Sequence, residues 1–549
     1  MTSRLTATEP PGPQPTHEPP RSWLASTDHK RIAILTLGTA LVLLFAMGGL
    51  ALAMRTQLAQ PDSDFVQNDT YNQLFTMHGS GMIYLVITPM ALALGLYLVP
   101  LQVGSPTVAA PRTTMLGYWL YVLGAIAVLS GFLTAGGAAK EGWTAYTPLS
   151  SARFAPNVGT DLWILGNFAS SLGMILIAGT VLWTVLLKRA RGMTMLRVPV
   201  FSWAMVATNL MVLAAFPSLL IALGLLAVGR MSPDVFSSNV WNIGYQHLFW
   251  FYGHPVVYVM FFPFVGAVAE VLATFARRRF FGYKATVLSL LAFAALSMSV
   301  WGHHMFTTGQ VADDYYSLTS IALLVPAGIE YFAMLGTIIG ARLRFSVPML
   351  FALAFIPQFL VGGLTGIMVA TPVLDYQMQD SYFVVAHFHY TLAAGSLFGF
   401  FAGFYFWFPK ATGIMLGKGL GHVHFWLMVV GINATFLPMF WLGMEGMPRR
   451  VASYLPTDGF GTLNFISTVG SWVLGVAMLA FAANLVVSIV RRRTRRAADN
   501  PWEAHTLEWA TSSPPPPLNF DAAHPLPPIT SFTPLLDLRR KHVKDREPT

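Results

Sequence analysis

The sequence contains no cysteine. This absence excludes disulfide bonds, iron–sulfur clusters and thiolate copper centres from the chain, so any redox centre of those kinds would have to belong to a partner protein. Charged residues are also scarce, at 10% of the 549 residues, whereas hydrophobic residues make up 54%. A soluble protein of this length rarely has such a composition. The balance therefore indicates a membrane protein with many spans.

Apolar stretches of roughly 20 to 30 residues follow one another along the chain, and each is long enough to cross about 30 Å of hydrocarbon. Twelve such stretches lie at 32–54, 76–103, 115–138, 160–187, 199–229, 242–274, 285–307, 315–341, 346–371, 381–409, 421–444 and 460–490. We therefore expect an all-α membrane protein with twelve transmembrane helices in one bundle. Residues 1–28 are expected to form a disordered N-terminal tail, residues 29–490 the membrane domain, and residues 491–549 an extended C-terminal tail that packs on that domain or on a partner.

The net charge of +9 does not indicate nucleic-acid binding, because the basic residues cluster at the ends of the apolar stretches. If the N-terminus is inside the cell, the inner loops carry more lysine and arginine than the outer loops. The run of basic residues from Arg491 to Arg496 after the last span agrees with this orientation. The positive-inside rule thus predicts that both termini are cytoplasmic.

Two histidines one residue apart, His387 and His389, interrupt the apolar run DSYFVVAHFHY at 380–390. A helix turns about 100° per residue, so these side chains leave it on nearly opposite sides. Imidazole buried in a membrane is costly, and it is the commonest nitrogen ligand of haem iron and copper. The alternative is a pair of polar residues that hydrogen bond to neighbouring helices, and the other histidines decide between the two interpretations.

Six of the fourteen histidines fall at one depth in the predicted bundle, in the outer half of the bilayer. They are His78, His254, His303, His304, His387 and His389. Unrelated core histidines would have no reason to share a depth, so this level indicates a metal and cofactor assembly. A haem with two imidazole ligands transfers electrons, a haem with one leaves a position open for a gas, and three further imidazoles suit copper. Tyr258 lies four residues after His254 on the same helix face, which places a phenol beside the proposed copper.

The motifs QHLFWFYGHPVVY, VWGHHMFTTG, VVAHFHY and GMPRR, in this order and spacing, resemble subunit I of the haem-copper oxidases, cytochrome c oxidase in particular. The resemblance covers nearly the whole chain, from STDHKRI to LEWATSSPPPP. It implies that His78 and His389 are the axial ligands of a low-spin haem and that His387 is the ligand of the oxygen-binding, high-spin haem. It assigns three histidines to copper, namely His254, His303 and His304.

The resemblance implies further cofactor contacts. Tyr258 matches the catalytic tyrosine that in the family is joined covalently to a copper-ligand histidine, here His254, and that supplies an electron and a proton during O–O cleavage. Arginine forks suit carboxylates, so Arg449 and Arg450 are expected to bind haem propionates. Arg55 occupies the place of the family residue that bonds a substituent of the low-spin haem, and Trp250 is expected beside the cofactors.

The family also implies two haems of the a type, one copper ion, and a magnesium ion at the interface with a partner subunit, for which Asp380 is the candidate ligand. The expected partners are a subunit II that carries the electron-accepting copper centre, a subunit III, cytochrome c as donor, O₂ and the lipid of a bacterial plasma membrane. Nucleic acid is not among them.

The residues of the expected proton paths depart from the family pattern. Thr107 and Val256 stand where family members usually have an aspartate and a glutamate, and Glu330 stands where the second path usually has a lysine. Gln379 replaces the histidine that precedes the metal-site aspartate. These departures argue against efficient proton pumping but leave the ligand set intact.

Two acidic residues could replace the missing groups. Glu330 is an intramembrane acid, and Glu270 lies twelve residues, or about 18 Å, inward of Tyr258. We hypothesise that both line a rebuilt proton path to Tyr258. The alternative is that each pairs with a nearby basic group.

The sequence therefore predicts the catalytic subunit of a terminal respiratory oxidase that reduces O₂ to water. A nitric oxide reductase-like enzyme is a related alternative, but such relatives generally lack the tyrosine supplied by Tyr258. A transporter or a non-catalytic haem-binding paralogue is the alternative from another class, and six ligand-type histidines at one depth argue against a transporter.

Overall fold

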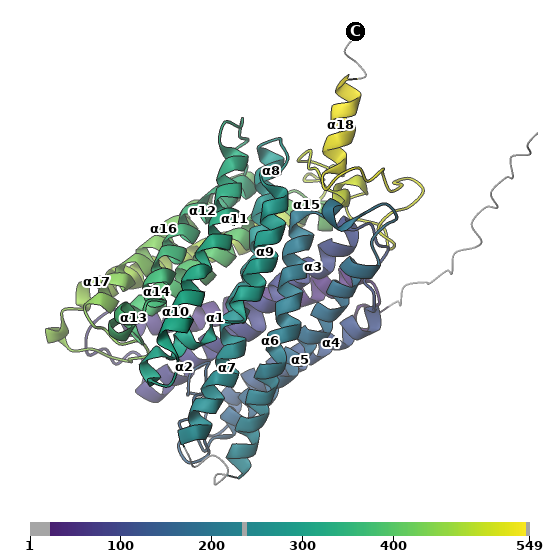
Figure 1. Ribbon diagram of the computed structural model, residues 1–549. Helices are drawn as coiled ribbons and strands as arrows, with labels where there is room; N and C mark the ends of the chain where they lie inside the picture. The colour runs from purple at the N-terminus through teal and green to yellow at the C-terminus, as the bar shows by residue number, and fades with distance from the viewer. Residues whose placement is uncertain (1–21, 233–238, 545–549) are drawn as a thin grey trace, which may run out of the picture.

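The computed structural model describes residues 22–232 and 239–544, and its regular structure in these ranges consists of helices without strands (Figure 1). Twelve helical segments are long and apolar enough to cross a membrane, and they lie side by side in one bundle. The predicted all-α architecture with twelve spans is confirmed. Of the tail expected over residues 1–28, residues 1–21 lie outside the described part, and Trp23–Ala25 form a single 3-10 turn.

The α-helices are numbered in chain order. They are α1 His29–Gln57, α2 Asn68–Ser80, α3 Thr88–Gln102, α4 Pro111–Ser130, α5 Val158–Leu187, α6 Val200–Met231, α7 Asn239–Val259, α8 Phe262–Phe275, α9 Tyr283–Ser297, α10 Asp313–Ala322, α11 Leu324–Ile338, α12 Val347–Val369, α13 Pro372–Met378, α14 Tyr382–Phe388, α15 Leu397–Thr412, α16 Lys418–Met444, α17 Gly461–Val490 and α18 Pro534–Lys544. Several spans combine two of these helices.

Three of the predicted spans change their winding beside the histidines. The π-helical segment η2 (Gly81–Ile87) follows His78, and the π-helical segment η7 (His389–Ser396) begins at His389. The sequence predicts His303 and His304 near the end of a continuous helix, but α9 ends at Ser297 and both lie in the 3-10 segment η6 (Trp301–Thr308). Such segments inside longer helices often mark functional positions.

The spans that carry His78, His254, His387 and His389 are the most enclosed. The apolar windows of Asn68–Gln102, Trp241–Phe275 and Tyr382–Thr412 are 94%, 89% and 78% buried, whereas that of Gly461–Val490 is 22% buried. A helix that is apolar on all sides and buried lies at the centre of a bundle. Four of the six histidines are therefore held by the central spans, and the peripheral spans leave most of their surface for lipid.

The C-terminal tail packs against one end of the bundle and ends in α18, a helix that the sequence does not predict (Figure 1). The 3-10 turn η9 (Leu507–Ala510) buries Leu507, Glu508 and Trp509. Lys30, in the first turn of α1, donates hydrogen bonds to the tail at Pro517 O (2.9 Å) and Asn519 Oδ1 (3.0 Å). The first span and the tail therefore meet at the same end of the molecule.

Candidate metal and cofactor centre

Three histidines from two spans converge on one point. The ligand nitrogens of His254 on α7 and of His303 and His304 on η6 all lie within 4.8 Å of one another. His254 Nδ1 is 3.3 Å from His304 Nε2, and His303 Nε2 is 3.1 Å from the same atom. Metal–nitrogen bonds of about 2 Å give separations of this size between ligands on one ion. The donor set consists of imidazoles alone, which fits copper.

Neighbouring groups fix the orientation of these rings. His303 Nδ1 is 2.6 Å from Ser320 Oγ, to which it donates when Nε2 is free to bind a metal. The ring of His304 stacks on Trp250, with ring centres 3.9 Å apart and planes 16° apart. Trp250 in turn donates to the hydroxyl group of Tyr146. The structure thus places Trp250 directly against one of the three histidines.

Tyr258 lies beside His254, with ring centres 4.7 Å apart. The His254 Nδ1 atom faces the other histidines, while its Nε2 atom is buried and has no hydrogen-bond partner among the described residues. A buried nitrogen without a partner is unusual in a native protein. One edge of the ring is therefore free for a metal and the other is free for a further bond.

His78 on α2 and His389 at the start of η7 face each other across a gap. Their rings are nearly parallel, with planes 12° apart and centres 6.5 Å apart. An iron ion midway between them, with bonds of about 2 Å to each ring, would hold the ring centres roughly 6 Å apart. His78 Nδ1 donates to Met47 O (2.9 Å) and His389 Nδ1 to Val385 O (2.8 Å). Each Nε2 is thereby left as the ligand atom.

His387 points to another side of the same span. Its Nδ1 atom lies 3.1 Å from Gly362 O and 3.2 Å from Thr365 Oγ1, so Nε2 is again left free. A Cβ atom at Gly366 would lie 3.0 Å from His387 Cε1, so α12 has a glycine where this ring approaches. His387 is near enough to His254 to interact with it electrostatically. One span therefore presents one histidine to each of two sites, as the HFH spacing predicts.

Arg55 near the end of α1 is buried and only partly satisfied. Its Nη2 atom donates to Asn464 O and Asn464 Oδ1, both at 2.9 Å, and to Thr468 Oγ1 at 3.3 Å. Its Nε and Nη1 atoms are buried without hydrogen-bond partners among the described residues. Buried donors of a charged group are normally paired. These two donors fit a polar substituent of a bound cofactor.

The Arg449–Arg450 pair lies in the loop after α16. The Arg449 side chain forms an ion pair with the Asp380 carboxylate. The Arg449 backbone N–H also donates a hydrogen bond to the Asp380 carbonyl oxygen (2.8 Å). Arg450 lies over the ring of Phe75, and burial together with the charge of Arg449 lowers its pKa to about 10. Asp380 is thus engaged by an arginine, while Arg450 keeps a half-buried positive charge available for an anionic group.

A second acidic residue near Asp380 is not predicted by the sequence. Asp375 on α13 is 1% exposed, and burial, with the nearby charge of Asp380, raises its pKa to about 7. With its amide nitrogen turned toward Asp375, Gln379 donates to both carboxyl oxygens at 3.0 Å. The spacing of four residues between them on a helical segment is the only signal that could have revealed this contact.

The two acids proposed for a proton path lie apart from the histidines along the bundle. Glu330 on α11 is 0% exposed, its Oε1 atom is 3.4 Å from Ser289 Oγ, and its Oε2 atom has no partner among the described residues. Glu270 on α8 is also buried and accepts a hydrogen bond from the backbone N–H of Phe201 at 3.4 Å. Neither forms an ion pair with a residue that the structure describes.

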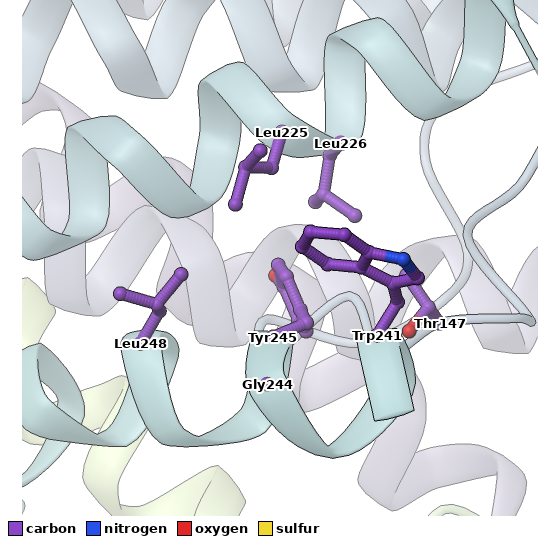
Figure 2. A pocket seen from close by; sticks show the side chains of 7 residues that line it. All are labelled: Thr147, Leu225, Leu226, Trp241, Gly244, Tyr245 and Leu248. Atoms are coloured by element: carbon purple, nitrogen blue, oxygen red, sulfur yellow. The ribbon is translucent and has the colours of Figure 1, made fainter. Parts of the chain in front are cut away.

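An apolar pocket lies between α6 and α7, separate from the histidines (Figure 2). Leucine side chains from both helices and the rings of Trp241 and Tyr245 line it. The Tyr245 hydroxyl donates to Thr144 O (2.8 Å), and its ring stacks on Phe249. None of the described residues that line the pocket is a histidine or a carboxylate suited to hold a metal ion.

Comparison with known proteins agrees with this geometry. Residues 31–473 match the family model of the cytochrome c and quinol oxidase polypeptide I. A cytochrome c oxidase subunit 1-beta from Nocardia farcinica is 47% identical over 529 residues, which cover 96% of this chain and 89% of that protein. A cytochrome c oxidase subunit 1 from Corynebacterium efficiens is 44% identical, covering 98% and 93%. A solved haem-copper terminal oxidase dimer matches the fold with a TM-score of 0.72 at 18% identity over 84% of each chain.

The chain therefore belongs to the cytochrome c and quinol oxidase polypeptide I family. It is the catalytic subunit of a terminal oxidase and a multi-pass protein of the bacterial plasma membrane. Membership of this family implies haem and copper cofactors and partner subunits.

Proposed function

We propose that the chain is the catalytic subunit of a cytochrome c oxidase that reduces O₂ to water at a haem-copper centre. The observation that carries this proposal is the convergence of the nitrogens of His254, His303 and His304 beside Tyr258. The facing pair of His78 and His389 supports the electron-transferring haem.

The cofactors are two haems of the a type and one copper ion. His78 and His389 would hold the low-spin haem iron, and His387 the high-spin haem iron. His254, His303 and His304 would hold copper. When bound, the high-spin haem and the copper supply the binding position and the electrons for oxygen chemistry.

The side chains around the cofactor positions orient the ligand rings and supply positive charge to the cofactor substituents. The bonds from Nδ1 of His78 and His389 to backbone carbonyls fix the tautomer that leaves Nε2 as the ligand. The free Arg55 donors suit a substituent on the low-spin haem, and Arg450 and Arg449 suit haem propionates. Tyr258, whose ring lies beside that of His254, would donate a proton and an electron at the copper side of the site.

Electrons arrive from cytochrome c through a partner subunit II that carries a copper centre, as the family implies. The absence of cysteine from this chain is compatible with that arrangement. A subunit III completes the assembly. Asp380 is the residue through which an outer magnesium ion would contact this chain, and its ion pair with Arg449 means that the partner must supply most of the ligands.

The membrane domain comprises residues 29–490, the C-terminal tail residues 491–549, and both termini are cytoplasmic. The contact of Lys30 with the tail supports placing both ends on one side.

Glu270 and Glu330 line the proton path, and the lack of basic partners within the described residues favours this role over simple ion pairing. Efficient pumping is not part of the proposal, because Thr107 and Val256 replace the usual carboxylates.

The test is metal, haem and oxygen analysis of the purified complex. We expect two haems and one copper ion per chain, CO binding by one haem, and oxygen uptake with reduced cytochrome c. Haem without copper would instead identify a non-catalytic paralogue. Rapid nitric oxide reduction without oxygen uptake would identify a nitric oxide reductase-like enzyme, which the presence of Tyr258 argues against.

A further inference from the structure

The C-terminal tail delivers a fully buried carboxyl group to one end of the membrane domain. Glu508, in η9, is 0% exposed. Its Oε1 atom accepts hydrogen bonds from Gln102 Nε2 (3.1 Å), Trp407 Nε1 (3.0 Å) and Thr506 Oγ1 (2.8 Å). Its Oε2 atom has no partner among the described residues. A carboxylate enclosed in this way is costly to keep ionised, so the side chain favours holding a proton.

A second buried carboxyl group faces the same place from the membrane domain. Glu270 accepts from the Phe201 N–H in the first turn of α6, and Ser202, the next residue, donates to Gln102 Oε1 at 2.7 Å. Gln102 in turn donates to Glu508. The amino end of α6 thus connects both acids, Glu270 through the Phe201 N–H and Glu508 through Ser202 and Gln102.

Lys410 on α15 brings a positive charge near Glu508 and near Asp499 of the tail. Its Nζ atom donates to Thr511 O (2.6 Å) and Ser512 O (3.1 Å) in the tail and lies over the ring of Trp509. Two enclosed carboxylates resist joint ionisation, because like charges repel each other at a buried site. Burial accordingly raises the pKa of Glu508 even though its hydrogen bonds act in the opposite direction.

The tail also covers the loop where family members usually carry a proton-path aspartate. Asn519 Nδ2 donates to Ser105 O at 2.7 Å, two residues before Thr107, and Lys30 holds Asn519 and Pro517 in place. The loop itself therefore has a threonine, Thr107, where the usual carboxyl group would stand. The tail that covers this loop contributes a different carboxyl group, that of Glu508.

We propose that Glu508 and Glu270 form a proton-holding pair that takes protons from the aqueous phase on the tail side and passes them into the membrane domain. In each cycle the Glu508 carboxyl group transfers its proton to the Glu270 carboxylate, and a hydronium ion on the tail side then protonates Glu508 again and leaves a water molecule. The pair thus acts as the first step of the path to Tyr258. This inference rests on the proposed oxidase function, because only oxygen reduction consumes the protons.

The test compares E508Q with E503Q in the complete complex. Glu503 is the matched control, because it lies in the same tail but is 63% exposed in an ion pair with Arg344. Steady-state oxygen uptake is measured from pH 6 to 9, proton uptake is followed with a pH-indicator dye during a single turnover, and CO binding reports intact haems. E508D retains the ionisable group and serves as the rescue variant.

We expect E508Q to bind CO like the wild type but to lose oxygen uptake roughly tenfold or more and to delay proton uptake by the same factor. E508D should recover most of the rate with a displaced pH profile, and E503Q should match the wild type. Wild-type rates and an unchanged pH profile in E508Q would overturn the proposal. If E508Q does not assemble, a wild-type pH profile in E508D would overturn it.

The results of these measurements distinguish a failure of the proton-holding pair from a failure of the proposed oxidase function. Wild-type complex with haems and copper but without oxygen uptake would refute the oxidase proposal itself. Normal oxygen uptake in both wild type and E508Q would refute the proton-holding pair alone.

Discussion

The histidines and the buried acids of this chain differ in how fully their polar atoms are hydrogen-bonded. His78, His303, His387 and His389 each have Nδ1 against a carbonyl or hydroxyl oxygen, which leaves Nε2 directed at a cofactor position. Glu330 and Glu508 each keep one buried carboxyl oxygen without a partner among the described residues. Metal ligation requires a fixed tautomer and direction, whereas proton transfer requires a group that can change its charge. The difference in hydrogen bonding is the one expected if the histidines hold the proposed cofactors and the acids carry the proposed protons.

The largest effect should follow from removing a copper ligand. His303→Ala should abolish copper binding and lower oxygen uptake by more than the roughly 10- to 100-fold that loss of a supporting group costs a metal site. Copper analysis and oxygen uptake measure this. His422→Ala is the control, because His422 lies exposed on α16. Full copper content in the His303 variant would contradict the assignment of the three histidines.

Removing the phenol should leave the metals in place. Tyr258→Phe should retain both haem spectra and copper while oxygen uptake falls by about a hundredfold or more, because a proton donor is lost and the ring is kept. Unchanged oxygen uptake would remove Tyr258 from the chemistry and reopen the reductase-like alternative.

A smaller effect is expected on the proton side. Glu330→Gln should slow turnover by about tenfold and leave both haem spectra intact, because the amide keeps the volume but carries no transferable proton. Glu445→Gln, at an exposed position after α16, is the control. Oxygen uptake at the wild-type rate would place Glu330 outside the path.

The smallest effect concerns stability near the Arg449 loop. The pKa of Asp375 is raised to about 7 in the folded protein from an ordinary value near 4, so the folded state binds more protons between these values. Stability should therefore fall as pH rises through this window and level off above about pH 7. Thermal unfolding of wild type and Asp375→Asn measures it, and the variant should lose this slope. Equal slopes would show that another group titrates there.

Sequence reasoning recovers what depends on local pattern. The twelve spans follow from apolar length, and the HFH spacing correctly places His387 and His389 on different sides of one span. The segments η2, η6 and η7 could not be predicted, because their winding depends on packing between spans. The same is true of the partners Met47 O and Gly362 O, which lie 31 and 25 residues from the histidines they contact.

The buried acids also differ in whether the sequence alone reveals them. Glu270 and Glu330 are visible in the sequence because they stand inside apolar runs. Glu508 is not, because it lies in a polar tail and is buried only through Gln102 and Trp407, far away in the chain. Asp375 is hidden for a similar reason, since its burial depends on how α13 packs.

The bonds from Lys30 to Pro517 and Asn519 also bear on how the protein is made. The first span leaves the ribosome long before residue 517 is synthesised, so its N-terminal end must wait without these partners until translation is almost complete. A chain truncated before the tail would leave the ammonium group of Lys30 without those two acceptors at a buried position. Quality-control proteases would then have a means of distinguishing unfinished chains from finished ones.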